Sequence, residues 1–325
     1  MYPLELIQIV RLITDVCLEV SPGEDVLCIG DKQENMDVIT LIAAECKAKG
    51  ADAAVVLIEP RRQHFHEPPR SVARAMKEAD VVIAMASLMH TKARKEACSS
   101  GVKYASMGSI TKEYLSSLNL TQDDLLEVRA LTEKIAQRLT AASSAHLTTR
   151  AGTDLRMSLE GRNGIALVPF GKRGAFCILP DYAEAPCAPI EDSVEGVAVV
   201  DGSMTGEPKL QGLVEEPFKI HFEKGRIVKI SEGKDAWRLQ SLLDTLEEEA
   251  RTFAELGVNS NHKASKKLIG TKWDDMIGGH IHFGLGRNDH IGGNSRGNTH
   301  LDLLVTWATL LLDGKPILED GKFKI

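Results

Sequence analysis

Short apolar runs alternate with amphipathic segments over residues 1–143 of the chain. Four such runs can be recognised, at residues 25–31, 53–60, 80–87 and 103–109. A segment of helical periodicity follows each run, for example at 36–49. Continuous apolar strands separated by helices are typical of a parallel sheet that is covered on both faces. We therefore predict a three-layer, doubly wound α/β domain in residues 1–143.

The pattern changes after residue 143. A long helix at 121–143, which has an acidic first turn, leads into segments that read as short strands and glycine turns. A hairpin is expected around residues 223–225, one helix at 235–255, and a glycine-rich region follows to the end. This pattern of short strands, glycine turns and one helix predicts a β-rich α+β domain in residues 144–325.

Composition and charge exclude some classes of function. The chain has 325 residues, a formal net charge of -7 and only 5% aromatic residues, so neither a basic surface nor a base-stacking surface for nucleic acid is expected. No apolar run has the length that a bilayer requires, and the start of the chain reads as an amphipathic helix. The six cysteines include no C-x-x-C pair, which favours reduced thiols. We expect a cytoplasmic protein without a membrane or nucleic-acid partner.

The first half carries no nucleotide-binding signature. The segment "CIGDKQENMD" after the first strand holds a single glycine, and neither G-x-G-x-x-G nor a Walker A motif occurs there. A doubly wound sheet alone does not specify a function. The candidate chemistry must therefore come from the second half.

Several histidines and carboxylates of the second half stand in apolar or glycine-rich segments: Glu184, Glu255, His280, His282, His300 and Asp302. His300 and Asp302 are two apart in an apolar run, so on a strand both would project to one side, about 6–7 Å apart at the backbone. Each residue alone has a structural explanation, as a hydrogen-bonded core histidine, a loop carboxylate or a solvated helix end. His290 is expected in an exposed turn.

Taken together, these residues predict a metal centre. Buried carboxylates and imidazoles without partners cost several kcal/mol, so they need each other, hydrogen bonds or a metal ion. A donor set of carboxylate and imidazole without thiolate suits divalent zinc, manganese, cobalt or iron, and a set rich in carboxylates fits a dinuclear site.

An ordered series of segments resembles the metalloaminopeptidases of the aminopeptidase T and aminopeptidase S type. The segments that carry the resemblance are "AGTDLRMSLEGR", "LPDYAEAPCAPIEDSVEG", "AELGVNSN", "GGHIHFGLG" and "THLDLLVTWATLLLDGKPILEDGKF". Each of these motifs is weak alone, whereas five in the same order are specific for the superfamily.

The resemblance implies a two-metal site and a reaction. The residues that match the family's ligands are Glu184, Glu255, His280, His300 and Asp302. Two divalent ions (zinc, cobalt or manganese) would activate a water molecule, with Glu255 taking its proton, to remove N-terminal residues from small peptides as a leucyl aminopeptidase-like enzyme. Arg287 stands where the family usually has a tyrosine and would serve as an oxyanion donor. The resemblance also implies a homodimer.

The same fold has a second branch, the 2,5-dihydroxypyridine ring-opening dioxygenases. They resemble this chain at His300 and Asp302 and hold one Fe(II), with a histidine at the position of Glu255. A 2-His-1-carboxylate set could be assembled here from His280, His300 and Asp302. Because Glu184 and Glu255 are both carboxylates, we favour the dinuclear aminopeptidase, keep the dioxygenase as the alternative, and leave open a metal-binding protein without activity.

Overall fold

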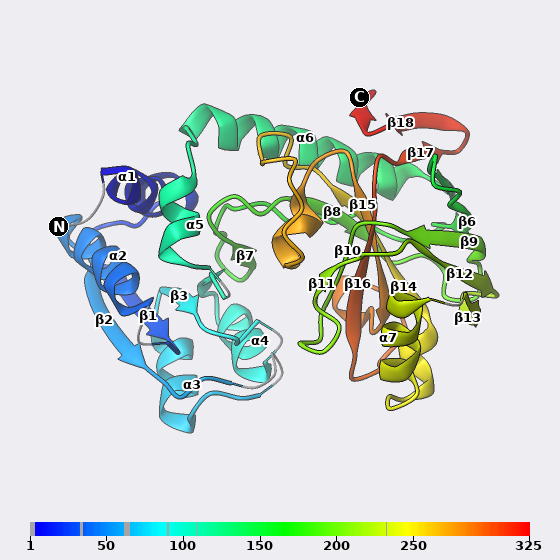
Figure 1. Ribbon diagram of the computed structural model, residues 1–325. Coiled ribbons are helices and arrows are strands. Elements are labelled where there is room, and N and C mark those ends of the chain that lie inside the picture. The colour runs from blue at the N-terminus through cyan, green and yellow to red at the C-terminus, as the bar shows by residue number, and fades with distance from the viewer. Residues whose placement is uncertain (1–3, 33–34, 62–65, 90, 109, 232) are drawn as a thin grey trace. The chain divides into compact units, whose positions relative to one another are not determined.

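The computed structural model describes residues 4–32, 35–61, 66–89, 91–108, 110–231 and 233–325. The chain forms two compact units, each of which is described here by itself (Figure 1). Unit 1 comprises Met1–Leu126 and Val168–Tyr182, and unit 2 comprises Glu127–Leu167 and Ala183–Ile325. This division differs from the domain boundary predicted at residues 143/144. Unit 2 starts already at Glu127, and the chain returns to unit 1 for a short excursion at Val168–Tyr182.

Unit 1 is built on a parallel sheet with the strand order β2-β1-β3-β4-β7. Its strands are β1 (Asp25–Gly30), β2 (Asp52–Leu57), β3 (Val81–Met85), β4 (Lys103–Ser106) and β7 (Phe176–Ile178). The four runs predicted from the sequence are thus confirmed as strands, and β3 is buried along its whole length. The excursion from unit 2 supplies β7, which adds to the edge of the sheet beside β4.

Helices surround this sheet. They are α1 (Leu4–Leu12), continued by the π-turn η1 (Ile13–Cys17), α2 (Met36–Ala48), α3 (Arg70–Glu78), α4 (Lys92–Ser99) and α5 (Lys112–Ser117). Helices α3 and α4 pack on each other and share one apolar cluster with β1, β3 and β4. Helix α2 contacts β1 and β2, and α1 contacts α2 and α5. The doubly wound α/β prediction is confirmed.

Most of the helix α6 (Gln122–Ala141), which is close to its predicted range, belongs to unit 2, and this unit contains two antiparallel sheets. The eight-stranded sheet has the order β13-β12-β9-β6-β5-β17-β18-β19. Its strands are β5 (Ser144–Thr148), β6 (Asp154–Ser158), β9 (Glu195–Val200), β12 (Phe218–Glu223), β13 (Arg226–Ile230), β17 (Thr309–Leu312), β18 (Lys315–Glu319) and β19 (Lys322–Phe323). The predicted hairpin at 223–225 is the turn between β12 and β13.

The six-stranded sheet has the order β11-β10-β16-β15-β14-β8. Its strands are β8 (Glu184–Cys187), β10 (Ser203–Thr205), β11 (Gly212–Leu213), β14 (Phe253–Asn259), β15 (Ile281–Gly286) and β16 (His300–Val305). The helix α7 (Lys234–Leu243) and three short 3-10 turns, η3 (Glu248–Arg251), η4 (Lys272–Met276) and η5 (Asp289–Ile291), complete the unit.

One apolar core joins the two sheets of unit 2. Phe222 from the eight-stranded sheet meets Phe253 and Phe283 from the six-stranded sheet, with ring centroids 5.3 to 5.9 Å apart. Each ring is at most 1% exposed, and burial of such a side chain stabilises a fold by about 1.5–3 kcal/mol. Alternate residues of the six-stranded sheet are therefore committed to the core, and the residues between them face the other way.

Among the residues that the structure describes, no helix is long and apolar enough to cross a membrane.

Candidate metal centre

Four adjacent strands of the six-stranded sheet carry the candidate ligands. Strand β8 supplies Glu184, β14 supplies Glu255, β15 supplies His282, and β16 supplies His300 and Asp302. The residues between them, such as Leu256, Phe283 and Leu303, belong to the core. Side chains alternate between the two faces of a strand, so the pattern that buries one face gathers the acids and histidines on the other.

Two glycines leave room for these side chains. Gly284 pairs with Glu255 on one side and with Asp302 on the other. A Cβ atom on Gly284 would lie 2.8 Å from both Glu255 Cβ and His300 Cε1, and a Cβ atom on Gly257 would overlap the His282 ring. The sheet therefore needs glycine at both positions to hold the cluster.

The ligand atoms form two groups among the described residues. One group contains Glu184, Glu255 and His282, and the other contains Glu255, His290 and His300; within each group the candidate ligand atoms lie within 4.8 Å of one another. Asp302 adjoins the second group, with its Oδ1 atom 3.1 Å from His300 Nε2. The sequence prediction that His300 and Asp302 project together is thus confirmed.

Glu255 belongs to both groups, and each of its oxygen atoms faces a different histidine. Oε1 lies 3.4 Å from His282 Nε2, and Oε2 lies 3.2 Å from His300 Nε2. His282 Nε2 is also 3.2 Å from Glu184 Oε2. This is the arrangement of a carboxylate that can bridge two cations.

The surroundings of both histidines direct Nε2 into the cluster. His300 Nδ1 lies 2.8 Å from the carbonyl oxygen of Arg287, which can only accept, so Nδ1 is the donor. His282 Nδ1 lies 2.7 Å from Asn259 Oδ1, and Asn259 Nδ2 donates to the carbonyl of Asp274 at 3.1 Å, which leaves Oδ1 as the acceptor. Both rings therefore keep Nε2 for a metal ion, as ligating histidines do.

Replacement of Asn259 by alanine is expected to weaken metal binding by about 10- to 100-fold without removing a ligand, because the His282 ring loses the acceptor that orients it. Asn259→Asp keeps an acceptor for Nδ1 and should restore most of the affinity. Competition with a chromophoric chelator measures both variants. Equal affinity of Asn259→Ala and the wild type would show that His282 needs no such support.

Buried carboxylate oxygens show that the cluster suits a cation. Asp302 Oδ1 is buried and lies 3.1 Å from His300 Nε2. Oδ1 of Asp275, a buried residue on η4, has no hydrogen-bond partner, whereas its Oδ2 accepts a hydrogen bond from Thr205 Oγ1 at 3.1 Å. Orphaned carboxylate oxygens are costly unless a positive charge lies nearby, so the donor set fits a divalent ion.

Three residues of this cluster escaped the sequence analysis. Asp275 interacts electrostatically with His282, and burial raises its pKa well above the usual range. Burial also lowers the pKa of Lys272 to about 8, partly offset by the charges of neighbouring carboxylates. His290 is exposed, as predicted, but its ring lies 5.0 Å from that of His300. No local motif marks these three, because η4 and η5 bring them to the strands only in the folded chain.

The structure places His280, which the sequence analysis named as a ligand, in a different environment. It belongs to neither group of candidate ligands among the described residues. Its Nδ1 atom accepts a hydrogen bond from the backbone N–H of Trp307 at 3.1 Å, and its ring meets the Trp307 indole edge-on at 5.2 Å. His282, two residues later and inside β15, is the histidine that the structure brings to the carboxylates.

Glu255 and Arg287 are placed differently from the expectation. Glu255 is the third residue of β14 instead of a helix end, because α7 stops at Leu243. The Arg287 guanidinium is paired with Asp289, which raises the pKa of Arg287. Arg287 contributes its backbone carbonyl to His300, whereas its side chain is engaged elsewhere.

Two solved structures share this fold. One is the 2,5-dihydroxypyridine dioxygenase from Pseudomonas putida KT2440, with 17% identity, a TM-score of 0.82, and coverage of 98% of this chain and 96% of that one. The other is wild-type AmpT from Thermus thermophilus, with 18% identity, a TM-score of 0.71, and coverage of 99% of both chains. Comparison with curated protein sequences gives no significant match.

The fold of this chain is therefore one that a 2,5-dihydroxypyridine dioxygenase and AmpT also have, and here it carries a carboxylate–histidine cluster on one sheet. Within it, the chain belongs to the NicX family, described as 2,5-dihydroxypyridine 5,6-dioxygenase, whose model matches residues 5–325.

Proposed function

We propose that this protein is an iron-dependent ring-opening dioxygenase that acts on a dihydroxylated, nitrogen-containing aromatic ring. The family match over residues 5–325 supports this assignment at the level of sequence. The observation that carries it in the structure is the group of Glu255, His290 and His300, which has the 2-His-1-carboxylate composition typical of non-haem Fe(II) oxygenases. This reverses the preference drawn from the sequence, which placed the aminopeptidase first.

The residues of the cluster have separate tasks in this proposal. A ferrous ion, when bound, would supply the one-electron chemistry that allows dioxygen to react with the ring. His300, oriented by the Arg287 carbonyl, and Glu255 would hold the ion together with His290. Asp302, whose Oδ1 atom lies 3.1 Å from His300 Nε2, would add a fourth donor or take a proton from a ring hydroxyl.

A metal-dependent aminopeptidase is the second candidate, and one observation favours it. Glu255 directs one oxygen to His282 and the other to His300, and Glu184 adds a second carboxylate beside His282. A centre that holds two ions of zinc, cobalt or manganese through a shared carboxylate would activate water for hydrolysis of a small peptide. If the protein is an aminopeptidase, Glu184 is essential for metal binding, whereas the proposed iron site of the dioxygenase does not include Glu184.

Glu184→Ala therefore separates the two functions. We expect this variant, loaded anaerobically with one equivalent of Fe(II), to keep its oxygen consumption with 2,5-dihydroxypyridine within about threefold of the wild type, because Glu184 lies outside the iron group. An oxygen electrode and elemental analysis make the measurement, and Glu184→Gln, which keeps the size of the side chain, serves as the control for packing.

The contrary outcome is equally specific. If the wild type binds two equivalents of zinc, cobalt or manganese and cleaves leucyl anilides, and if Glu184→Ala lowers that cleavage by more than about 100-fold, the dioxygenase proposal is wrong. A homodimer and a cytoplasmic location remain predictions, which light scattering and fractionation would test.

A further inference from the structure

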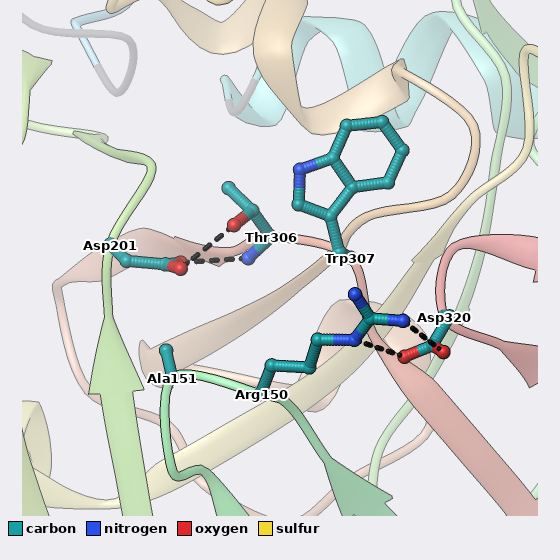
Figure 2. Close-up of a pocket in the computed structure, with 6 residues that line it drawn as sticks. All are labelled: Arg150, Ala151, Asp201, Thr306, Trp307 and Asp320. Carbon is teal, nitrogen blue, oxygen red and sulfur yellow. Dashed lines mark hydrogen bonds and ion pairs between the residues drawn. The ribbon is translucent and has the colours of Figure 1, made fainter.

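A second site lies in unit 2 apart from the candidate ligands of the metal centre. It is a pocket of about 260 Å³ lined by Arg150, Ala151, Asp201, Thr306, Trp307 and Asp320 (Figure 2). These residues come from the turns that join β5 to β6, β9 to β10, β16 to β17 and β18 to β19. Four connections thus meet at one pocket, and none of its lining residues is a candidate metal ligand.

The backbone holds Trp307 at this pocket in a strained conformation. Trp307 has a φ of +48°, which is rare for a bulky residue, and its side chain is 52% exposed. Such strain persists only where the surroundings enforce it. Here the buried His280 accepts the Trp307 N–H and packs against the indole edge. The backbone of Trp307 is therefore held in place while its indole ring is exposed to solvent, and His280 supports this residue outside the metal centre.

Asp201 is a half-buried carboxylate with a fixed orientation. It accepts hydrogen bonds from Thr306 N at 2.8 Å and from Thr306 Oγ1 at 2.7 Å. Figure 2 shows both bonds running from Asp201 to Thr306, next to the indole. A carboxylate offers about four acceptor positions, so two remain available to a further donor.

The opposite side of the pocket is an exposed ion pair. Arg150 donates to Asp320 through Nε at 3.1 Å and Nη2 at 2.6 Å, and the Arg150 side chain is 80% exposed. An exposed pair of this kind contributes little to stability, so Arg150 can leave Asp320 at little cost. The pocket then combines two carboxylates with an aromatic face and only one positive charge.

We propose that this pocket binds an organic cation, an ammonium or guanidinium group, over the face of Trp307 and against Asp201 and Asp320. Cations bind to the face of tryptophan more strongly than to other aromatic rings, and carboxylates supply the matching charge. Arg150 acts as the internal competitor that covers Asp320 when the pocket is empty. The cation can be a free small amine or guanidine, or a basic side chain of a peptide.

Titration of the whole protein with methylguanidinium chloride, followed by tryptophan fluorescence, tests this proposal. We expect a saturable change with a millimolar Kd that is lost in Trp307→Phe and kept in Trp237→Phe, which removes an exposed tryptophan of α7 instead. Asp201→Asn, which retains the acceptor for Thr306, should weaken binding by about tenfold. Calorimetry provides the same Kd values without relying on fluorescence.

Arg150→Met gives the most decisive result, because an increase and a decrease in the affinity for methylguanidinium lead to opposite conclusions. Removal of the internal competitor should tighten methylguanidinium binding by at least about threefold. If Arg150→Met instead abolishes binding, or if acetate binds in place of methylguanidinium, the pocket is an anion site and the proposal is wrong. The absence of any saturable change in the wild type overturns it as well. Tighter binding of N-acetyl-arginine amide than of methylguanidinium would identify a peptide side chain as the source of the cation.

Discussion

Replacement of Glu255 by alanine is expected to empty both groups of the metal centre at once and to lower the activity to below about 1% of the wild type. Glu255 is the one residue that both groups share, and its two oxygens face His282 and His300 separately. Loss of a residue that merely supports a ligand costs about 10- to 100-fold in affinity, so loss of a shared ligand should exceed that at each group. Elemental analysis after dialysis and a turnover assay on the same sample measure the effect.

The result depends on the variant remaining folded. Glu255 is 3% exposed, and its removal takes one of two neighbouring carboxylates from each of His282 and His300. Glu255→Gln, which preserves the volume but not the charge, is therefore measured in parallel, and Glu249→Ala on the exposed surface of η3 serves as the control. A folded Glu255→Ala protein that retains its metal and its turnover would show that Glu255 does not hold a cation.

Much of the cluster could be predicted because β-strand periodicity is strict. In "THLDLLV" the apolar residues Leu301, Leu303 and Val305 are fully buried, so His300 and Asp302 had to share the opposite face. The same rule could not choose between His280 and His282, which have the same parity. The choice depended on where β15 starts, and Ile281 is its first residue. The start of a strand is set by its pairing with neighbours, which a single segment does not reveal.

Residues outside the strands could not be predicted for a different reason. Asp275 and His290 lie on short 3-10 turns, where no strand periodicity fixes the direction of a side chain. The excursion that supplies β7 is similar, since three residues pair with β4 across a gap of about seventy positions. Contacts of this kind arise from tertiary packing, whereas the strands β1 to β4 of unit 1 follow from local apolar runs.

The metal-free centre is expected to hold protons where cations bind, so metal affinity should rise steeply with pH. Burial by itself lowers the pKa of His282, but Glu184, Glu255 and Asp275 outweigh it and raise that pKa from 6.5 to about 10. The pKa of His300 is also raised well above its usual value, by Asp302 and Glu255 against the effect of burial. Both rings therefore carry a proton on Nε2 at pH 7, and a metal ion must displace it.

The pH dependence of stability follows from the same shifts in the pKa of the histidines. A raised pKa of His282 in the folded state stabilises the metal-free protein fully below pH 6.5, and this contribution is lost as the pH rises through about 10. In the presence of metal the trend should reverse between pH 6.5 and 9, because each displaced proton increases the affinity by about tenfold per pH unit. Thermal unfolding with and without metal, at three pH values in this range, measures both trends. A metal affinity that does not change with pH would show that the histidines are neutral in the metal-free protein.

The number of protons released also separates the two proposed functions. An ion bound only by the group of Glu255, His290 and His300 displaces the proton of His300, whereas a centre with both groups filled displaces those of His282 and His300. Calorimetric titration in buffers of different ionisation enthalpy counts these protons directly. Release of about one proton per chain is the result expected for the iron-dependent dioxygenase. Release of about two protons on binding two ions would show that Glu255 bridges the ions and that the reaction is hydrolysis.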